Sequence, residues 1–117
     1  MEATILQKAV QMYVEAFEKA DPNIIRQLYA ADATVEDPVG TPPRRGIEEI
    51  IEFYKTAFGM GMKLKLTGKP RCASNSVAFI FDAVMKEMAF SPIDVFELNA
   101  DGKVQEMRAY WGPENVS

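Results

Sequence analysis

In the first half of the chain, hydrophobic residues recur every three or four positions, which is the spacing of one helix face. Three such stripes predict three helices, over residues 5–20, 22–29 and 47–59. The second begins at Asp21-Pro22, a capping residue followed by a proline at the first helical position. The third ends near Gly59. Each stripe contains one tyrosine: Tyr13, Tyr29 and Tyr54.

From residue 62 onward, alternation of apolar and polar residues replaces the helical spacing. It predicts strands over residues 62–66, 77–90, 93–98 and 104–111, with a hairpin turn at 99–102. A short strand over 33–37 precedes the turn-rich segment 38–46. Helices followed by strands predict an α+β fold, with three helices packed on one curved antiparallel sheet. A chain of 117 residues is expected to form a single domain, residues 1–117.

The composition excludes several classes of function. The net charge of -4 gives no electrostatic reason to bind nucleic acid or an anionic membrane. Charged residues interrupt the first 20 positions, so they form neither a signal peptide nor a membrane span. The single cysteine, Cys72, cannot form a disulfide within the chain, which fits a reducing compartment. Together these features predict a cytoplasmic protein. Without histidine or a glycine-rich phosphate loop, we expect no metal or nucleotide cofactor. Any chemistry must use carboxylates, phenols, lysine or arginine.

Asp37 is the first candidate for such chemistry. A residue that precedes a proline favours extended geometry, so Ala33, Val35 and Asp37 share one face of the short strand. Asp37 is therefore predicted to point inward. A carboxylate on an apolar face, with no histidine to pair with, is costly to bury. We interpret it as a group that handles a proton rather than as an accident of packing.

Asp94 is a second carboxyl group predicted to lie in apolar surroundings. By strand alternation it shares a face with Phe96 and Leu98, so it should tend to be protonated. The three tyrosine hydroxyls are expected to converge inside, either as a polar network or as the lining of a cavity. Two aspartates with pKa values driven apart would allow one to act as a base and the other to donate a hydrogen bond.

Several segments also carry a family likeness: residues 29–43 around Asp37-Pro38, and residues 53–54, 66–68, 93–95 and 107–111. Through these segments, and over nearly the whole chain, the sequence resembles the bacterial Δ5-3-ketosteroid isomerases, also called steroid Δ-isomerases. The resemblance implies a conical fold of the nuclear-transport-factor-2-like type and a homodimer formed through the outer sheet face. It also implies a small apolar steroid as substrate, with no metal or organic cofactor.

Matched residue by residue, the resemblance implies that Asp37 is the general base. It would move a proton from the carbon next to the ketone to the far end of the dienolate. Tyr13 and a protonated Asp94 would donate hydrogen bonds to the dienolate oxygen, since this family keeps an aspartic acid neutral for that purpose. Tyr29 and Tyr54 would support and orient this oxyanion hole. The pocket wall would include three further residues: Phe53, Met107 and Trp111.

Two other interpretations stay open. One is another chemistry on the same fold, such as that of a polyketide cyclase, a dehydratase or an epoxide hydrolase. Cyclases and dehydratases of this fold generally rely on histidine, which this chain lacks. Epoxide hydrolases hold water with an Asp-Arg-Asp arrangement, but here Arg108 lies by alternation on the face opposite Trp111. The other is a non-catalytic binder of small apolar ligands, although such a binder usually loses the base or the oxyanion hole. Arg44 and Arg45 place more charge after the base than the resemblance predicts.

Overall fold

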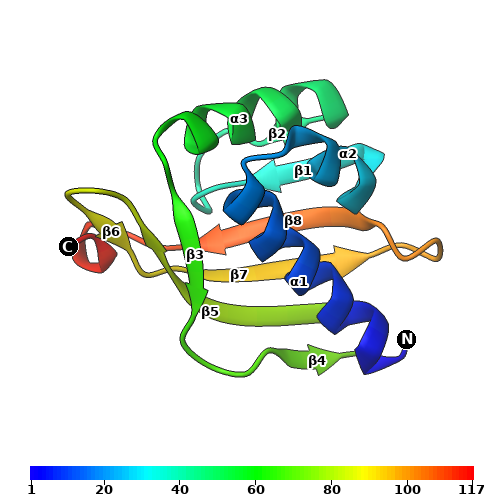
Figure 1. Ribbon diagram of the computed structural model, residues 1–117. Helices are drawn as coiled ribbons and strands as arrows, with labels where there is room; N and C mark the ends of the chain where they lie inside the picture. The colour runs from blue at the N-terminus through cyan, green and yellow to red at the C-terminus, as the bar shows by residue number, and fades with distance from the viewer.

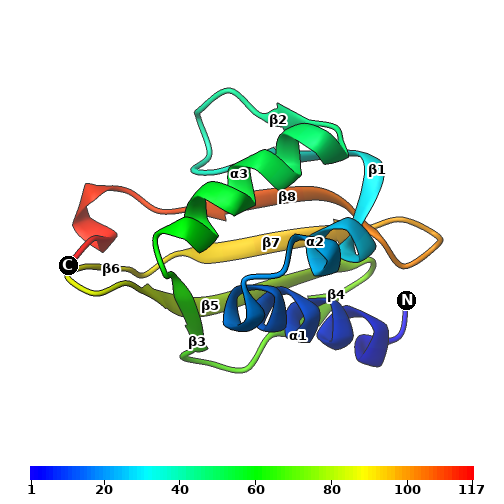
Figure 2. The ribbon, with the colours of Figure 1, turned by 45° about the horizontal axis from the view of Figure 1, so that its top comes forward.

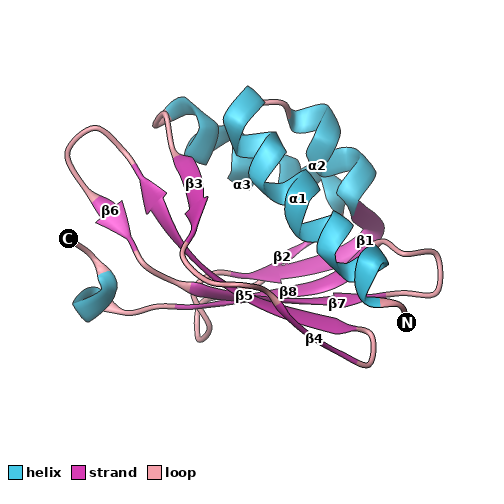
Figure 3. Cartoon of the chain, turned by 60° about the horizontal axis from the view of Figure 1, so that its bottom comes forward, coloured by secondary structure: helices cyan, strands magenta, loops and turns pink.

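Three helices cover one face of a strongly curved sheet in the computed structural model, which describes residues 1–117 (Figures 1 and 3). The helices are α1 (Ala3–Lys19), α2 (Pro22–Leu28) and α3 (Ile47–Gly59). The strands are β1 (Tyr29–Glu36), β2 (Arg44–Arg45), β3 (Lys63–Leu66), β4 (Arg71–Ala73), β5 (Ser76–Val84), β6 (Ala89–Phe90), β7 (Ile93–Leu98) and β8 (Val104–Tyr110). The 3-10 helix η1 (Pro113–Asn115) follows β8. The predicted α+β architecture is confirmed.

The helices form where the hydrophobic spacing places them. The stripe predicted for α1 is the face that the helix buries, from Leu6 to Phe17. At the start of α2, the Asp21 side chain accepts a hydrogen bond from the Asn23 N–H at 2.9 Å, as expected for a capping residue. At the carboxyl end of α1, Lys63 Nζ donates to main-chain carbonyl groups of the last turn, which is a favourable place for a cation. None of the helices has both the length and the hydrophobicity that crossing a membrane requires.

Tyr29 is the one tyrosine that the prediction placed in the wrong element. It begins β1, since α2 ends at Leu28 and the backbone of Tyr29 is extended. The Tyr29 N–H still donates to the Ile25 carbonyl, so helix and strand meet at this residue without a loop. Its side chain is nevertheless buried, because the helical stripe and the inner face of the strand coincide at the junction.

The main sheet has the order β2-β1-β8-β7-β5-β3, and β4 and β6 also pair with β5. Its neighbouring strands are antiparallel, as predicted, except that β1 and β8 run parallel. No tight turn joins β1 to β8, so the hairpin constraint that forces antiparallel pairing does not apply to them. The predicted hairpin at residues 99–102 does join β7 to β8. The predicted strand over 77–90 is instead two strands, β5 and β6.

Strand β5 changes partners along its length. Its first half pairs with β7 and β4, and its second half pairs with β3 and β6. The second half thus leaves the plane of β7 and β8, consistent with the curl of the sheet in Figures 2 and 3. The apolar core fills the space between the concave face and the helices. Asp94 is the one charged residue among the fully buried side chains.

Candidate active site

A cavity of about 780 Å³ opens between α1, α3 and the inner face of the sheet. Of the 20 residues that line it, 12 are hydrophobic, so its chemistry is concentrated in a few polar groups. Four of these are predicted site residues: Tyr13, Asp37, Tyr54 and Asp94. The exposed glutamates of α3 mark the mouth: Glu48, Glu49 and Glu52.

Asp37 lines this cavity and lies directly after β1, which ends at Glu36. It continues the inward alternation of Ala33 and Val35, both fully buried, as the sequence predicted. Because β1 and β8 run parallel, their carboxyl ends lie at the same edge of the sheet. That arrangement brings Trp111, which follows β8, next to Asp37. The Trp111 indole Nε1 donates to Asp37 Oδ1 at 2.8 Å.

The electrostatic setting of Asp37 is mixed. Partial burial raises the pKa of its carboxyl group, because desolvation penalises the charged form. The Trp111 hydrogen bond and the positive charge of Arg44 act in the opposite direction and lower that pKa. Asp37 therefore keeps partners that favour the carboxylate, as a general base requires.

Asp94 lies deeper, on β7, where Phe79 of β5 and Ala109 of β8 are its neighbours in register. Its exposed fraction is 1%, and neither carboxyl oxygen has a hydrogen-bond partner. Burial, and then the negative charge of Asp37, raise the pKa of Asp94 well above its usual value, while the Tyr13 hydroxyl offsets part of this effect. An ionised carboxylate without partners is very costly inside a protein, so we expect Asp94 to hold its proton.

The three tyrosine hydroxyls form a chain, as the sequence predicted. Tyr29 and Tyr54 share a hydrogen bond of 2.5 Å, and Tyr54 donates to the Tyr13 hydroxyl at 3.3 Å. Since Tyr54 donates to Tyr13, the proton of Tyr13 itself is free to point toward a ligand in the cavity. Burial is the largest of the effects that raise the pKa of each phenol, so all three remain protonated donors.

Aromatic rings fix the position of Tyr13. Phe17, Phe79 and Phe96 each meet its ring edge to face, with centroids between 5.1 and 5.8 Å apart. Such contacts are favourable for aromatic pairs, and together they leave the Tyr13 ring little freedom to move. The hydroxyl donor is therefore held on a rigid support.

Most of the predicted site residues come together in this cavity. Those that line it are Tyr13, Asp37, Phe53, Tyr54, Asp94 and Trp111, while Tyr29 lies behind Tyr54. Met107 was predicted to belong to the wall, and this is corrected by the structure. It is fully buried in the core, opposite Val35 and Phe96 in register, and does not line the cavity. Strand alternation gives the face of a residue but not how far along the strand the cavity extends.

Among the lining residues that the sequence reasoning did not assign to the site, Phe90 and Arg44 lie near Trp111 and Asp37. Phe90 on β6 packs against Trp111, with ring centroids 4.9 Å apart, and both residues line the cavity. Arg44 on β2 also lines the cavity. The hydrophobic run around Phe90 was visible in the sequence, but its break into two strands was not. No group of three or more histidine, cysteine, aspartate or glutamate side chains is arranged to hold a metal ion.

Comparisons with known proteins agree with this geometry. Residues 10–107 match the family of SnoaL-like domains. A steroid Δ-isomerase from Nocardioides simplex is 38% identical over 112 residues, which cover 92% of this chain and 90% of that protein. The protein is therefore a member of the SnoaL-like family, with a nuclear-transport-factor-2-like fold, and is related to the steroid Δ-isomerases.

Proposed function

We propose that this protein isomerises Δ5-3-ketosteroids to Δ4-3-ketosteroids by moving one proton within the substrate. The relation to a steroid Δ-isomerase supports isomerase activity in general. The observation that carries the specific reaction is that two aspartates in opposite electrostatic settings line one apolar cavity. Asp37 accepts a hydrogen bond from Trp111, whereas neither oxygen of Asp94 has a hydrogen-bond partner.

In the first step, the Asp37 carboxylate takes a proton from the carbon between the ketone and the double bond. The electron pair of that C–H bond moves into the conjugated system, and the ketone oxygen becomes the anionic oxygen of a dienolate. In the second step, Asp37 returns the same proton to the far carbon of the former double bond, which leaves the double bond conjugated with the ketone. Trp111 occupies Oδ1 of Asp37, so Oδ2 is the oxygen available to carry the proton.

The opposite side of the cavity would stabilise the dienolate. Tyr13 and Asp94 each have a proton to donate toward the substrate oxygen, and both are held in a site from which water is largely excluded. The chain from Tyr29 through Tyr54 polarises the Tyr13 hydroxyl and fixes its orientation. No additional group is needed to balance the reaction, because the proton that leaves the substrate returns to it.

The cavity suits a flat apolar ligand. Its volume lies within the range of about 300–1,000 Å³ that is usual for small-molecule sites. Phe53, Phe90 and Trp111 provide aromatic surface along the wall, and Met60 and Met62 add flexible apolar side chains. These features support a steroid as the substrate class.

The direct test follows the ultraviolet absorbance of a Δ5-3-ketosteroid as it becomes the conjugated Δ4 isomer. We expect turnover with the purified protein and no added cofactor. Tight binding of a phenolic steroid without any turnover would instead favour a non-catalytic binder. Failure of both binding and turnover would favour a different chemistry on the same fold.

A homodimer is a second part of the proposal. On the outer sheet face, Ile80, Ile93 and Tyr110 lie side by side in register and are 44%, 44% and 46% exposed. Such an apolar row across three strands is typical of a surface that another subunit covers. Sedimentation analysis should show a dimer that Ile93→Asp dissociates, and a wild-type monomer would contradict the assignment. The cytoplasmic location remains a prediction from the sequence.

A further inference from the structure

Two consecutive arginines on β2 have different surroundings. Arg44 and Arg45 pair with Val35 and Thr34 of β1, and successive side chains of a strand point to opposite sides. Arg44 lines the cavity that holds Asp37. Arg45 lines a separate small pocket of about 140 Å³, together with Glu106 and Arg108. Only the first of the two arginines therefore acts on the interior of the site.

The Arg44 side chain is held by two contacts. Its guanidinium carbon lies 4.3 Å from the centroid of the Phe53 ring, a stacking distance for a cation on an aromatic face. Its NH1 group also donates to the main-chain carbonyl of Asp37 at 3.4 Å. The planar guanidinium thus joins the cavity wall on α3 to the backbone of the proposed base.

The balance of charge in the cavity gives this arginine its importance. Five carboxyl groups line the cavity, and Arg44 is the only basic side chain among the lining residues. The lining carboxyl groups are Asp37, Glu48, Glu49, Glu52 and Asp94. An anionic base in such a setting is destabilised unless a cation remains close to it.

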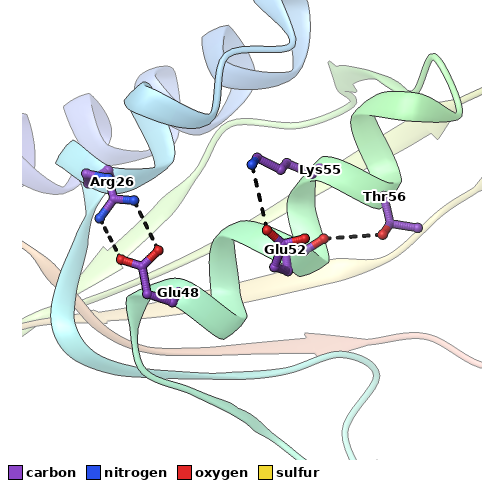
Figure 4. A network of polar contacts seen from close by, with 5 residues as sticks. All are labelled: Arg26, Glu48, Glu52, Lys55 and Thr56. Carbon is purple, nitrogen blue, oxygen red and sulfur yellow. Dashed lines mark hydrogen bonds and ion pairs between the residues drawn. The ribbon is translucent and has the colours of Figure 1, made fainter.

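The glutamates at the mouth do not need Arg44, because they have other partners (Figure 4). Glu48 receives two hydrogen bonds from Arg26, at 3.0 and 3.2 Å, and Lys55 approaches Glu52 to 3.7 Å. Glu49 accepts the main-chain N–H of Arg45 at 3.3 Å. Arg44 forms no ion pair with any of them and remains beside Asp37.

Several elements around Asp37 contribute titratable or charged groups to the cavity. The titratable and charged groups around the cavity are Tyr13 of α1, Tyr54 and the three glutamates of α3, Asp94 of β7 and Arg44 of β2. Only two of the neighbours of Asp37 favour its ionised form: the Trp111 N–H and the Arg44 cation. Trp111 is a neutral donor, so Arg44 is the only charged neighbour that favours the ionised form of Asp37.

We propose that Arg44 is a positioning residue for the base, which fixes the backbone of Asp37 against the cavity wall and supplies the one positive charge that favours its ionised form. The kinetic part of this inference rests on the proposed isomerase function. The electrostatic part does not, because the ionisation of Asp37 is measurable without any substrate.

Three variants separate charge from shape. Arg44→Gln removes the cation, Arg44→Lys keeps a cation without the planar group, and Arg45→Gln is the matched control on the same strand. The carboxyl carbon of Asp37 is titrated by NMR in protein that carries 13C-labelled aspartate, with Asp37→Asn to assign the signal. The acid limb of kcat/KM against pH is then measured with a Δ5-3-ketosteroid.

We expect Arg44→Gln to move the Asp37 titration to higher pH by about half a unit, which is less than the roughly 1–3 units typical of a close ion pair. The acid limb of kcat/KM should move in the same direction, because a carboxyl group with a raised pKa is protonated over a wider range. Arg44→Lys should remain close to wild type in both titrations, and Arg45→Gln should change neither.

An unchanged Asp37 titration in Arg44→Gln would overturn the inference. So would a shift of equal size in Arg45→Gln, or an equal shift in Arg44→Lys, because charge at this one position would then not be the cause. If no variant or wild-type protein turned over steroid but the NMR titration shifted as expected, the isomerase proposal would fail while the role of Arg44 in ionisation remained.

Discussion

The two aspartates of the cavity are alike in being at least partly buried, but they differ in the groups that contact their carboxyl oxygens. Burial raises the pKa of both carboxyl groups. Asp37, at the sheet edge, accepts a hydrogen bond from Trp111 and lies beside Arg44. Asp94, the second residue of β7, has no hydrogen-bond partner for either oxygen. The two carboxyl groups therefore differ in their partners rather than in burial alone.

The comparison shows why the two groups belong on different parts of the fold. The end of a strand is open to loops and to residues of neighbouring strands, so it can receive an indole and a guanidinium. Asp94 lies instead within the paired part of β7, between Phe79 and Ala109 in register, and neither of these neighbours offers a polar side chain. The proposed mechanism uses this contrast, and each of the following predictions tests one side of it.

The largest effect is expected from Asp37→Asn. The amide is nearly isosteric but does not accept a proton at neutral pH, so kcat should fall by roughly the 10²- to 10⁴-fold that a positioned base contributes. Binding of a phenolic steroid, measured by fluorescence titration, should remain within a few-fold of wild type. A variant that kept more than about a tenth of wild-type kcat would show that Asp37 is not the base.

The next largest effect is expected at Tyr13, whose free proton is proposed to meet the dienolate oxygen. Tyr13→Phe should lower kcat on the order of 10²- to 10³-fold, the usual cost of one oxyanion donor. Tyr54→Phe and Tyr29→Phe should cost much less, because their protons are used within the tyrosine chain. Equal losses in all three variants, compared in one steady-state assay, would indicate a purely structural network.

Two substitutions of Asp94 test whether its side chain acts as a hydrogen-bond donor or as a negative charge. Asp94→Asn retains an N–H group that can donate to the substrate oxygen, whereas Asp94→Ala has none. We expect the asparagine variant to keep on the order of tenfold more activity than the alanine variant, as a lost donor costs up to a few kcal/mol. Phenolic steroid should also bind more weakly to the alanine variant. Equal damage in both, with Asp94 ionised in the complex, would exclude the donor role.

The last prediction concerns stability. The pKa of Asp94 is raised in the folded state, so below the unfolded pKa of about 3.9 both states hold the proton. As pH rises above that value, the unfolded chain loses the proton first, and the native state loses up to about 1.4 kcal/mol of stability per pH unit until Asp94 itself ionises. Asp94→Asn removes this loss.

Urea unfolding at pH 4.5 and pH 7 measures this difference between wild type and Asp94→Asn. The asparagine variant should gain stability relative to wild type as pH rises over that interval. Asp37→Asn is the matched control and should show a smaller change, because Trp111 and Arg44 offset part of the effect of burial on the Asp37 pKa. The same pH dependence in wild type and Asp94→Asn would mean that Asp94 is not neutral in the folded protein.

Local pattern predicted much of this fold. The hydrophobic stripes located the three helices, and the alternation of residues placed Asp37 and Asp94 on inward faces. These predictions succeed because the periods of helices and strands are properties of neighbouring residues, which the sequence displays directly. Even at Tyr29, where the element was wrong, the burial of the side chain was predicted correctly.

What the sequence determined by itself is which side chains face inward and which chemical groups are present: carboxyl and phenol groups, with no histidine. The tertiary structure decided which of these groups meet. The parallel pairing of β1 with β8 brings Trp111 to Asp37 across 74 positions of sequence, and the short strand β2 turns Arg44 toward the same cavity. Strand pairing depends on contacts between distant segments, so no local period records it. The depth of Met107 was decided in the same way, by its neighbours across the sheet rather than along the chain.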